Sequence, residues 1–150
     1  MKLEQTNRVI IKIGSALLFN ETSGSLNKEW LNSLAEDVKY LRENDKEVII
    51  VSSGAIAMGA KDLDLDMKNM KMDMNQAVSA VGQIHLMGSF KSAFEKNEIK
   101  ISQILLTLDD TEQRRRSINA RRTIDTLLKL GIVPVVNEND TIATSEIRYG

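Results

Sequence analysis

The chain has 150 residues, of which 42% are hydrophobic and 27% are charged, and its formal net charge is -1. This length and composition are typical of one globular domain and exclude a disordered chain. The near-neutral charge argues against a general attraction to nucleic acid or to an anionic membrane. The sequence has no cysteine, which excludes disulfides, thiolate zinc sites and thiol nucleophiles. No apolar run reaches membrane-spanning length and the amino end is not that of a signal peptide, so we expect a cytoplasmic protein.

The first predicted element is a β-strand over Val9–Ile13, an apolar run that Lys12 interrupts and that Gly14 and Ser15 end as a turn. Because the run is apolar on both faces, we expect it in the middle of a covered sheet. A lysine is costly there unless the strand end opens onto an anion, and a glycine lets backbone N–H groups approach that anion. The stretch is therefore a candidate phosphate site. The alternative is a lysine that extends to solvent, and these residues alone favour that alternative.

A helix and a second strand follow. Asn20–Gly24 has the composition of a turn, and Asn27 is a suitable N-cap for a helix that runs to about Asn44. Val48–Val51 is a short, wholly apolar strand. Two such strands joined by a helix predict a right-handed βαβ unit with parallel strands.

Small residues follow the second strand, over Ser52–Gly59. They predict a tight strand-to-helix turn, whose free N–H groups and helix dipole would bind an anion. The alternative is a packing turn in which only small residues fit.

The middle of the chain is predicted as a loop followed by a long helix. Asp62–Met74 alternates methionine with charge, which favours a loop, and the helix is expected from about Asn75 to Lys96. The only histidine, His85, lies on this helix without a second ligand nearby in the sequence, so we interpret it as a surface or partly buried residue rather than a metal ligand. The apolar stripe of the helix consists of Ala77, Ala80, Val81, Ile84, Met87, Phe90 and Phe94.

The last third predicts a strand over Ile99–Leu106, a loop over Thr107–Asp110 and a helix that ends at Leu130 with Gly131 as its cap. Two arginine runs accompany this helix; we interpret them as a solvated face, with nucleic-acid binding as the weaker alternative. Ile132–Val136 predicts a fourth strand. It contains the only proline, near its start, and the polar residues Asn137–Asp140 follow it.

Three strand ends therefore carry polar groups, and the carboxyl ends of parallel strands meet at one edge of the sheet. They are Lys12 with Gly14, Ser53 with Gly54, and Asn137–Asp140. The lysine and its glycine turn suit a transferring phosphoryl group, the small-residue turn suits a carboxylate, and Asp140 suits an ammonium group. The predicted ligand is a zwitterionic, acidic molecule beside a nucleotide, although the usual nucleotide-binding motifs are absent.

Several stretches resemble the amino-terminal part of the glutamate 5-kinase family, within the amino acid kinase superfamily. The lysine strand is common to the superfamily, whereas the Ser-Ser-Gly-Ala-Ile-Ala and Asn-Glu-Asn-Asp stretches are specific to this family. The matching stretches keep the family's order and spacing; they are Val9–Ser15, Val51–Gly59, Val81–Gln83, Gln103–Thr107, Asn119–Arg121 and Ile132–Asp140.

The resemblance implies an α/β fold: a three-layer αβα sandwich with a mainly parallel central sheet, of which this chain is the amino-terminal half. It implies transfer of the γ-phosphate of ATP, with Mg²⁺, to the γ-carboxylate of L-glutamate, the first step of proline biosynthesis, with proline as feedback inhibitor. It also implies a homo-oligomer in the full-length protein, and no nucleic acid or membrane as a partner of this part.

By the same resemblance, Lys12 binds ATP phosphate and stabilises the transferring group, with Gly14 and Ser15 as further ATP-binding residues. Glutamate-binding positions match Ser53, Gly54, Asn137 and Asp140. No residue is predicted as a metal ligand. Ala16 departs from the family, in which a hydroxyl residue is common there, and this puts a secondary phosphate contact in doubt.

Family members continue beyond the equivalent of Gly150 with a nucleotide-binding half. We therefore expect residues 1–150 to be the substrate-binding part of the domain, and the isolated chain to be inactive. Two alternatives stay open: another superfamily kinase, acting on acetylglutamate, aspartate or a nucleoside monophosphate, or a non-catalytic module that binds glutamate or proline.

Overall fold

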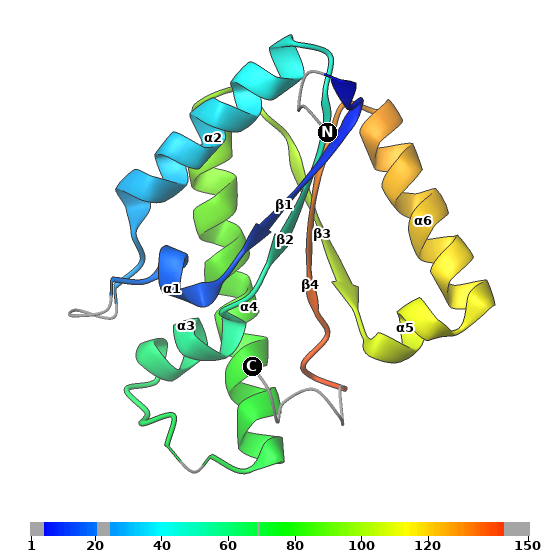
Figure 1. The fold of residues 1–150 in the computed structure, drawn as a ribbon. Helices are drawn as coiled ribbons and strands as arrows, with labels where there is room; N and C mark the ends of the chain where they lie inside the picture. Colours follow the sequence, from blue (N-terminus) through cyan, green and yellow to red (C-terminus); the bar gives the residue numbers. More distant parts are fainter. Residues whose placement is uncertain (1–4, 21–24, 69, 143–150) are drawn as a thin grey trace.

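The computed structural model describes residues 5–20, 25–68 and 70–142. Its centre is a sheet of four parallel strands in the order β1-β2-β4-β3 (Figure 1), which confirms the predicted parallel α/β sheet. The strands are β1 (Arg8–Ile13), β2 (Glu47–Ser52), β3 (Ile101–Leu106) and β4 (Val133–Glu138). The helices are α1 (Ser15–Leu18), α2 (Lys28–Glu43), α3 (Ala55–Asp62), α4 (Met72–Glu95), α5 (Leu108–Glu112) and α6 (Arg114–Lys129).

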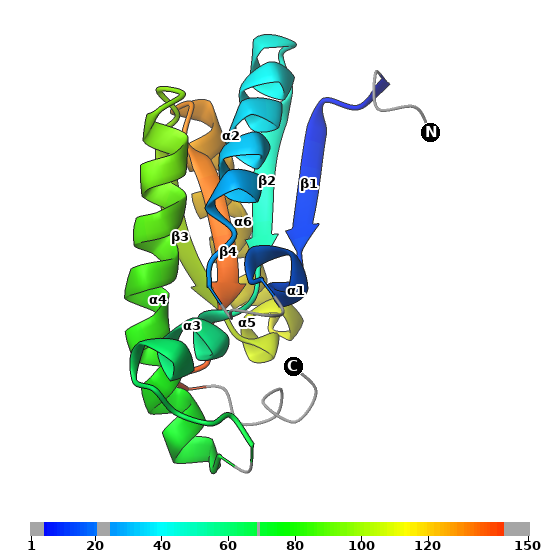
Figure 2. The same cartoon turned by 90° about the vertical axis from the view of Figure 1, so that its left-hand side faces the viewer.

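Helices cover both faces of the sheet, as expected for three layers. Helices α2 and α4 lie on one face and α6 on the other (Figures 1 and 2). The connection from β1 to β2 crosses the sheet in one direction, and the connection from β3 to β4 crosses it in the opposite direction. Crossovers of the same hand therefore place α2 and α6 on opposite faces.

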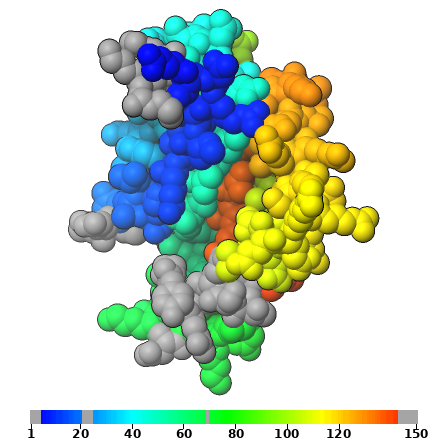
Figure 3. All heavy atoms as spheres, turned by 45° about the vertical axis from the view of Figure 1, so that its right-hand side comes forward, coloured from blue at the N-terminus to red at the C-terminus, as the bar shows by residue number. Residues whose placement is uncertain are grey.

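The hydrophobic core lies between the sheet and the α2–α4 layer. It includes Ile50 of β2, Val38 of α2 and Phe90 of α4, all fully buried. Helix α6 has no fully buried residue among those described. In Figure 3, orange atoms of β4 remain visible between the β1–β2 side and the α5–α6 side. The sandwich is therefore packed tightly on one face and loosely on the other.

Strand β1 is at an edge of the four-stranded sheet, so the prediction of a central position is wrong for the described part of the chain. Its residues from Arg8 to Lys12 alternate between exposed and partly buried, and Ile10 is 63% exposed. An apolar run of this length is compatible with either position, because the run alone does not say how many neighbours a strand has.

The apolar stripe of α4 coincides only in part with the face that the helix buries, and the helix begins at Met72 rather than Asn75. Ile84 of the apolar stripe is 74% exposed, whereas Phe90 and Phe94 are fully buried. Apolar and small residues occur all around this helix, so their spacing does not select one face. The residues that the helix buries are Val78, Ser79, Gly82, Gln83, Leu86, Phe90, Ala93 and Phe94.

Several local boundaries also differ. Asn137 is part of β4, not of the loop after it, and the predicted loop over Thr107–Asp110 is a helix start. There Thr107 and Asp110 form a capping box, in which each side chain bonds the other residue's backbone N–H. Gly131 has a φ of +72° just after α6, in agreement with its predicted role at the helix end. Of the predicted turn Asn20–Gly24, residues 21–24 lie outside the described residues.

Candidate functional site

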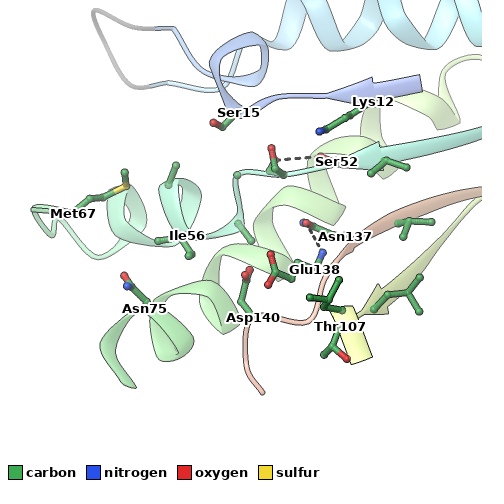
Figure 4. A pocket seen from close by; sticks show the side chains of 18 of the residues that line it. Lys12, Ser15, Ser52, Ile56, Met67, Asn75, Thr107, Asn137, Glu138 and Asp140 are labelled. Atoms are coloured by element: carbon green, nitrogen blue, oxygen red, sulfur yellow. Dashed lines mark hydrogen bonds between the residues drawn. The ribbon is translucent and has the colours of Figure 1, made fainter. Parts of the chain in front are cut away.

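A pocket of about 730 Å³ lies at the carboxyl ends of the strands (Figure 4). It is lined by residues from all four strands, from the amino ends of α1, α3 and α5, and from the first turn of α4. The predicted site residues Lys12, Ser15, Ser53, Gly54, Asn137 and Asp140 all line it. The structure therefore brings together all the predicted site residues except Gly14.

Lys12 supplies positive charge on the β1 side of the pocket, opposite Asn137 and Asp140 (Figure 4). Its side chain is exposed and forms no ion pair within the described ranges. An ammonium group that no protein carboxylate neutralises can attract an anionic ligand. Lys12 is therefore placed where it could meet an anionic ligand, and its predicted contact with phosphate stays a prediction.

The glycine that the local geometry requires is Gly54 rather than Gly14. Gly54 is the N-cap of α3 with a φ of +106°, and a Cβ there would lie 2.8 Å from Cε2 of Phe19. Gly14 has an extended backbone, and a Cβ added to it would have no heavy atom within 4 Å. The predicted contact between Gly14 and ATP stays a prediction.

The turn that Gly54 allows places the amino end of α3 against the pocket. Ala55, Ile56 and Ala57, the first residues of the helix, all line it. Free N–H groups at a helix amino end carry partial positive charge, so they suit an anionic group of a ligand. Ser53 ties this turn to the end of β1, because its hydroxyl donates to the carbonyl oxygen of Ile13 at 3.3 Å.

The end of β4 supplies a hydrogen-bond donor and a carboxylate. The Oδ1 atom of Asn137 accepts a bond of 2.8 Å from the backbone N–H of Glu138. The Nδ2 atom of Asn137 is buried and has no hydrogen-bond partner among the described residues. A buried amide without a partner costs free energy unless a ligand accepts its hydrogen. Asp140 follows the strand, and its side chain is 8% exposed at the pocket wall.

Helix α4 contributes polar residues to this site that our sequence reasoning missed. Ser79 donates a hydrogen bond of 2.6 Å to Oδ2 of Asp140, and Gln83 Nε2 donates one of 3.4 Å to the carbonyl oxygen of Glu138. Asn75 lines the pocket itself. Asn75, Ser79 and Gln83 recur every fourth residue, so they share one helix face. This spacing of polar residues by four was the signal that could have identified them.

Asp110 lies beside the pocket, next to the lining residue Thr107. Its pKa is lowered, first by the backbone N–H of Thr107, then by the hydroxyl of Thr107, and further by the nearby guanidinium of Arg116. The ionised carboxylate therefore stabilises the start of α5. No group of three acidic or histidine side chains that could hold a metal ion occurs among residues 5–20, 25–68 and 70–142.

The pocket thus combines a lysine, a helix amino end, an amide donor and a carboxylate. A ligand with a carboxylate or phosphoryl group at one end and an ammonium group at the other would find an opposite charge for each. None of the described helices combines the length and hydropathy that a membrane-spanning segment needs.

Comparisons with known proteins identify the family. Residues 7–150 match the model of the "Amino acid kinase family". The chain belongs to the amino acid kinase family. It is 57% identical over 150 residues to the "Glutamate 5-kinase" of Pelagibacter ubique (strain HTCC1062), and 53% identical over 148 residues to that of Ruegeria sp. (strain TM1040).

The match covers all of this chain and 40% of the Pelagibacter relative, and 99% of this chain and 40% of the Ruegeria relative. The chain therefore spans about 40% of the length of these curated relatives. Among solved structures, an isopentenyl phosphate kinase from T. acidophilum, in a product complex, has a TM-score of 0.58 at 18% identity. That similarity covers 87% of this chain and 54% of the other, and it supports the amino acid kinase fold alone.

Proposed function

We propose that this chain is the substrate-binding part of a glutamate 5-kinase. The reaction is ATP-dependent phosphorylation of the γ-carboxylate of L-glutamate to glutamyl 5-phosphate, the first step of proline biosynthesis. The curated relatives named glutamate 5-kinase support this proposal, because they match the chain from end to end. The single structural observation that carries it is the pocket in which Lys12, the amino end of α3 and Asp140 meet.

In the proposed reaction, an oxygen of the glutamate γ-carboxylate forms a bond to the γ-phosphorus of ATP. The bond from that phosphorus to the bridging oxygen breaks, and ADP leaves with the electron pair. The attacking carboxylate is already ionised at neutral pH, so this step needs no base. Lys12 offsets negative charge on the transferring group, and the N–H groups at the amino end of α3 together with Asn137 Nδ2 orient carboxylate oxygens.

Asp140 holds the other end of the substrate. Its carboxylate would repel the phosphates of ATP, whereas the α-ammonium group of glutamate carries the opposite charge. Ser53 and Gly54 lie at the same edge and complete the glutamate side. Lys12, Gly14 and Ser15 form the ATP side. Mg²⁺ would accompany ATP, and we assign it no ligand among these residues.

Further parts of the proposal extend to the whole enzyme. They are a cytoplasmic location, feedback inhibition by proline, homo-oligomer formation, and a nucleotide-binding half outside residues 1–150. These follow from the family resemblance, and the length of the relatives supports the last of them.

The test is a chimera in which this chain replaces the matching part of the Pelagibacter ubique enzyme. The relative then supplies the rest of its own length, and this chain supplies the pocket described above. We expect ADP release that depends on L-glutamate, together with an acyl phosphate product that hydroxylamine traps as a hydroxamate. Activity with N-acetylglutamate, aspartate or a nucleoside monophosphate in place of glutamate would contradict the proposal.

A second measurement uses the 150-residue chain alone. L-glutamate should raise its melting temperature, because a ligand that binds only the folded state stabilises it. D-glutamate is the matched control, since it presents the same charges with the opposite configuration.

A further inference from the structure

We propose that Ser79 is a positioning residue, whose hydroxyl holds the Asp140 carboxylate in the orientation that meets the ammonium group of the substrate. The inference rests on the proposed function and extends it to α4, on which none of the predicted substrate-binding residues lies. Ser79 is 1% exposed and does not line the pocket, whereas Asp140 is 8% exposed and does. Ser79 therefore acts on a ligand only through Asp140.

The direction of the hydrogen bond supports this role. An ionised carboxylate only accepts, so the Ser79 hydroxyl must donate to Oδ2, at 2.6 Å. A hydroxyl bonded to a charged group at this distance is among the stronger hydrogen bonds of proteins. It limits the rotation of the Asp140 side chain and thereby the direction of its negative charge.

The location of Asp140 explains why such support matters. Asp140 lies in a turn just after β4, beyond the last ladder pair of the sheet, which joins Leu106 to Glu138. Helix α4, in contrast, is a long element with eight buried residues. A hydrogen bond to this rigid helix restricts the Asp140 carboxylate more than the turn in which Asp140 lies does.

A second contact from α4 holds the same segment. Gln83, one turn after Ser79, donates to the carbonyl oxygen of Glu138, and its own Oε1 accepts a bond of 3.1 Å from Gln103 of β3. The two contacts fix the backbone and the side chain of the segment separately. Of the two residues, only Ser79 contacts the side chain of Asp140, which we propose binds the substrate.

The experiment measures the kinetics of Ser79→Ala in the chimera. We expect KM for L-glutamate to rise about tenfold, the scale of one hydrogen bond to a charged group, with kcat and KM for ATP within about twofold of wild type. The matched control is Ser89→Ala on the same helix, where the hydroxyl donates to the backbone carbonyl of His85 at 2.9 Å. It should leave all three constants unchanged.

A double-mutant cycle separates positioning from a general packing effect. If Ser79 acts through Asp140, then Ser79→Ala should raise KM for glutamate by less than about twofold in an Asp140→Asn background. If the double variant instead raises KM for glutamate by the product of the two single-variant increases, the inference is overturned. Ser79→Cys keeps the shape with a weaker donor, so KM should rise in the same direction even if Ser79→Ala does not fold.

The outcomes also separate the inference from the proposed function. A wild-type chimera that releases ADP without any dependence on glutamate, and a chain whose melting temperature glutamate does not change, would together refute the proposed function. A glutamate-dependent chimera in which Ser79→Ala or Ser79→Cys leaves KM for glutamate unchanged would refute the role of Ser79 alone.

Discussion

Gly59 of α3 and Gly82 of α4 pack backbone against backbone where the two helices cross. A Cβ on Gly59 would lie 1.9 Å from the carbonyl oxygen of Val78, and one on Gly82 would lie 1.8 Å from that of Ala55. Backbone atoms cannot rotate away, so only glycine at both positions permits this separation. The contact fixes the amino end of α3, which lines the pocket, relative to the face of α4 that carries Asn75, Ser79 and Gln83.

Gly82→Ala should therefore separate α3 from α4 and destabilise the protein by about 1–3 kcal/mol, the usual range for overpacking. The matched control is Gly88→Ala on the same helix, where an added Cβ meets no atom within 4 Å. That change should stabilise the protein by about 0.5–1 kcal/mol, because alanine favours a helix over glycine. Urea unfolding measures the free energy of unfolding of both variants, which should change in opposite directions. Equal changes would contradict the close packing of α3 against α4.

Gly54→Ala should cost about 1–3 kcal/mol, because alanine at a φ of +106° is strained and its Cβ would lie against the ring of Phe19. Gly14→Ala is the comparison, since its φ of -78° suits any residue. It should be neutral or stabilising by less than about 1 kcal/mol. Thermal unfolding of the two variants distinguishes a required glycine from a tolerated one.

Lys12→Ala in the chimera should lower kcat by about two to three orders of magnitude, because a charge directed at the transferring phosphoryl group is lost. Lys39→Ala, which removes the same charge from an exposed position of α2, should leave kcat unchanged. Steady-state ADP release measures both variants. Near wild-type turnover of Lys12→Ala would contradict the assigned role.

Asp140→Asn should raise KM for L-glutamate about ten- to hundredfold and leave KM for ATP nearly unchanged, since one charged hydrogen bond is worth about 1.5–3 kcal/mol. Asp37→Asn on the exposed side of α2 is the control for the change of charge. The alternative role for Asp140 is to cap nearby backbone N–H groups. That role predicts a lower melting temperature with unchanged affinity for glutamate.

Asp110 predicts a pH dependence of stability. Its pKa is lowered by Thr107 and Arg116, so the ionised form stabilises the folded state. This contribution is complete above the ordinary aspartate pKa of about 4 and is lost as pH falls through the lowered value. The difference in melting temperature between wild type and Asp110→Asn should therefore be constant above about pH 5 and shrink at lower pH. Asp109→Asn, in the same helical turn but exposed, is the control.

Much of the architecture could be predicted from the sequence because the strands are apolar runs bounded by small or polar residues. Once β1 and β2 were predicted to be parallel, Lys12 and Ser53 had to meet at one edge, and the structure confirms this. The support from α4 could not be predicted in the same way. The contact between Ser79 and Asp140 joins residues 61 positions apart and depends on the helix face, which close packing at the two glycines selects.

The shortest backbone ladder of the sheet, here called the seam, joins β2 to β4. Strand β1 pairs with β2 over its full length, and β3 pairs with β4 likewise, but β2 and β4 share only Ile50 with Val135 and Val51 with Val136 among the described pairs. The pocket is lined from both sides of this seam. A molecule bound there would bridge the two βαβ halves. A ligand in the pocket should therefore slow amide hydrogen exchange most in β2 and β4, where the two strands face each other. Exchange at this seam would then be a measure of ligand binding.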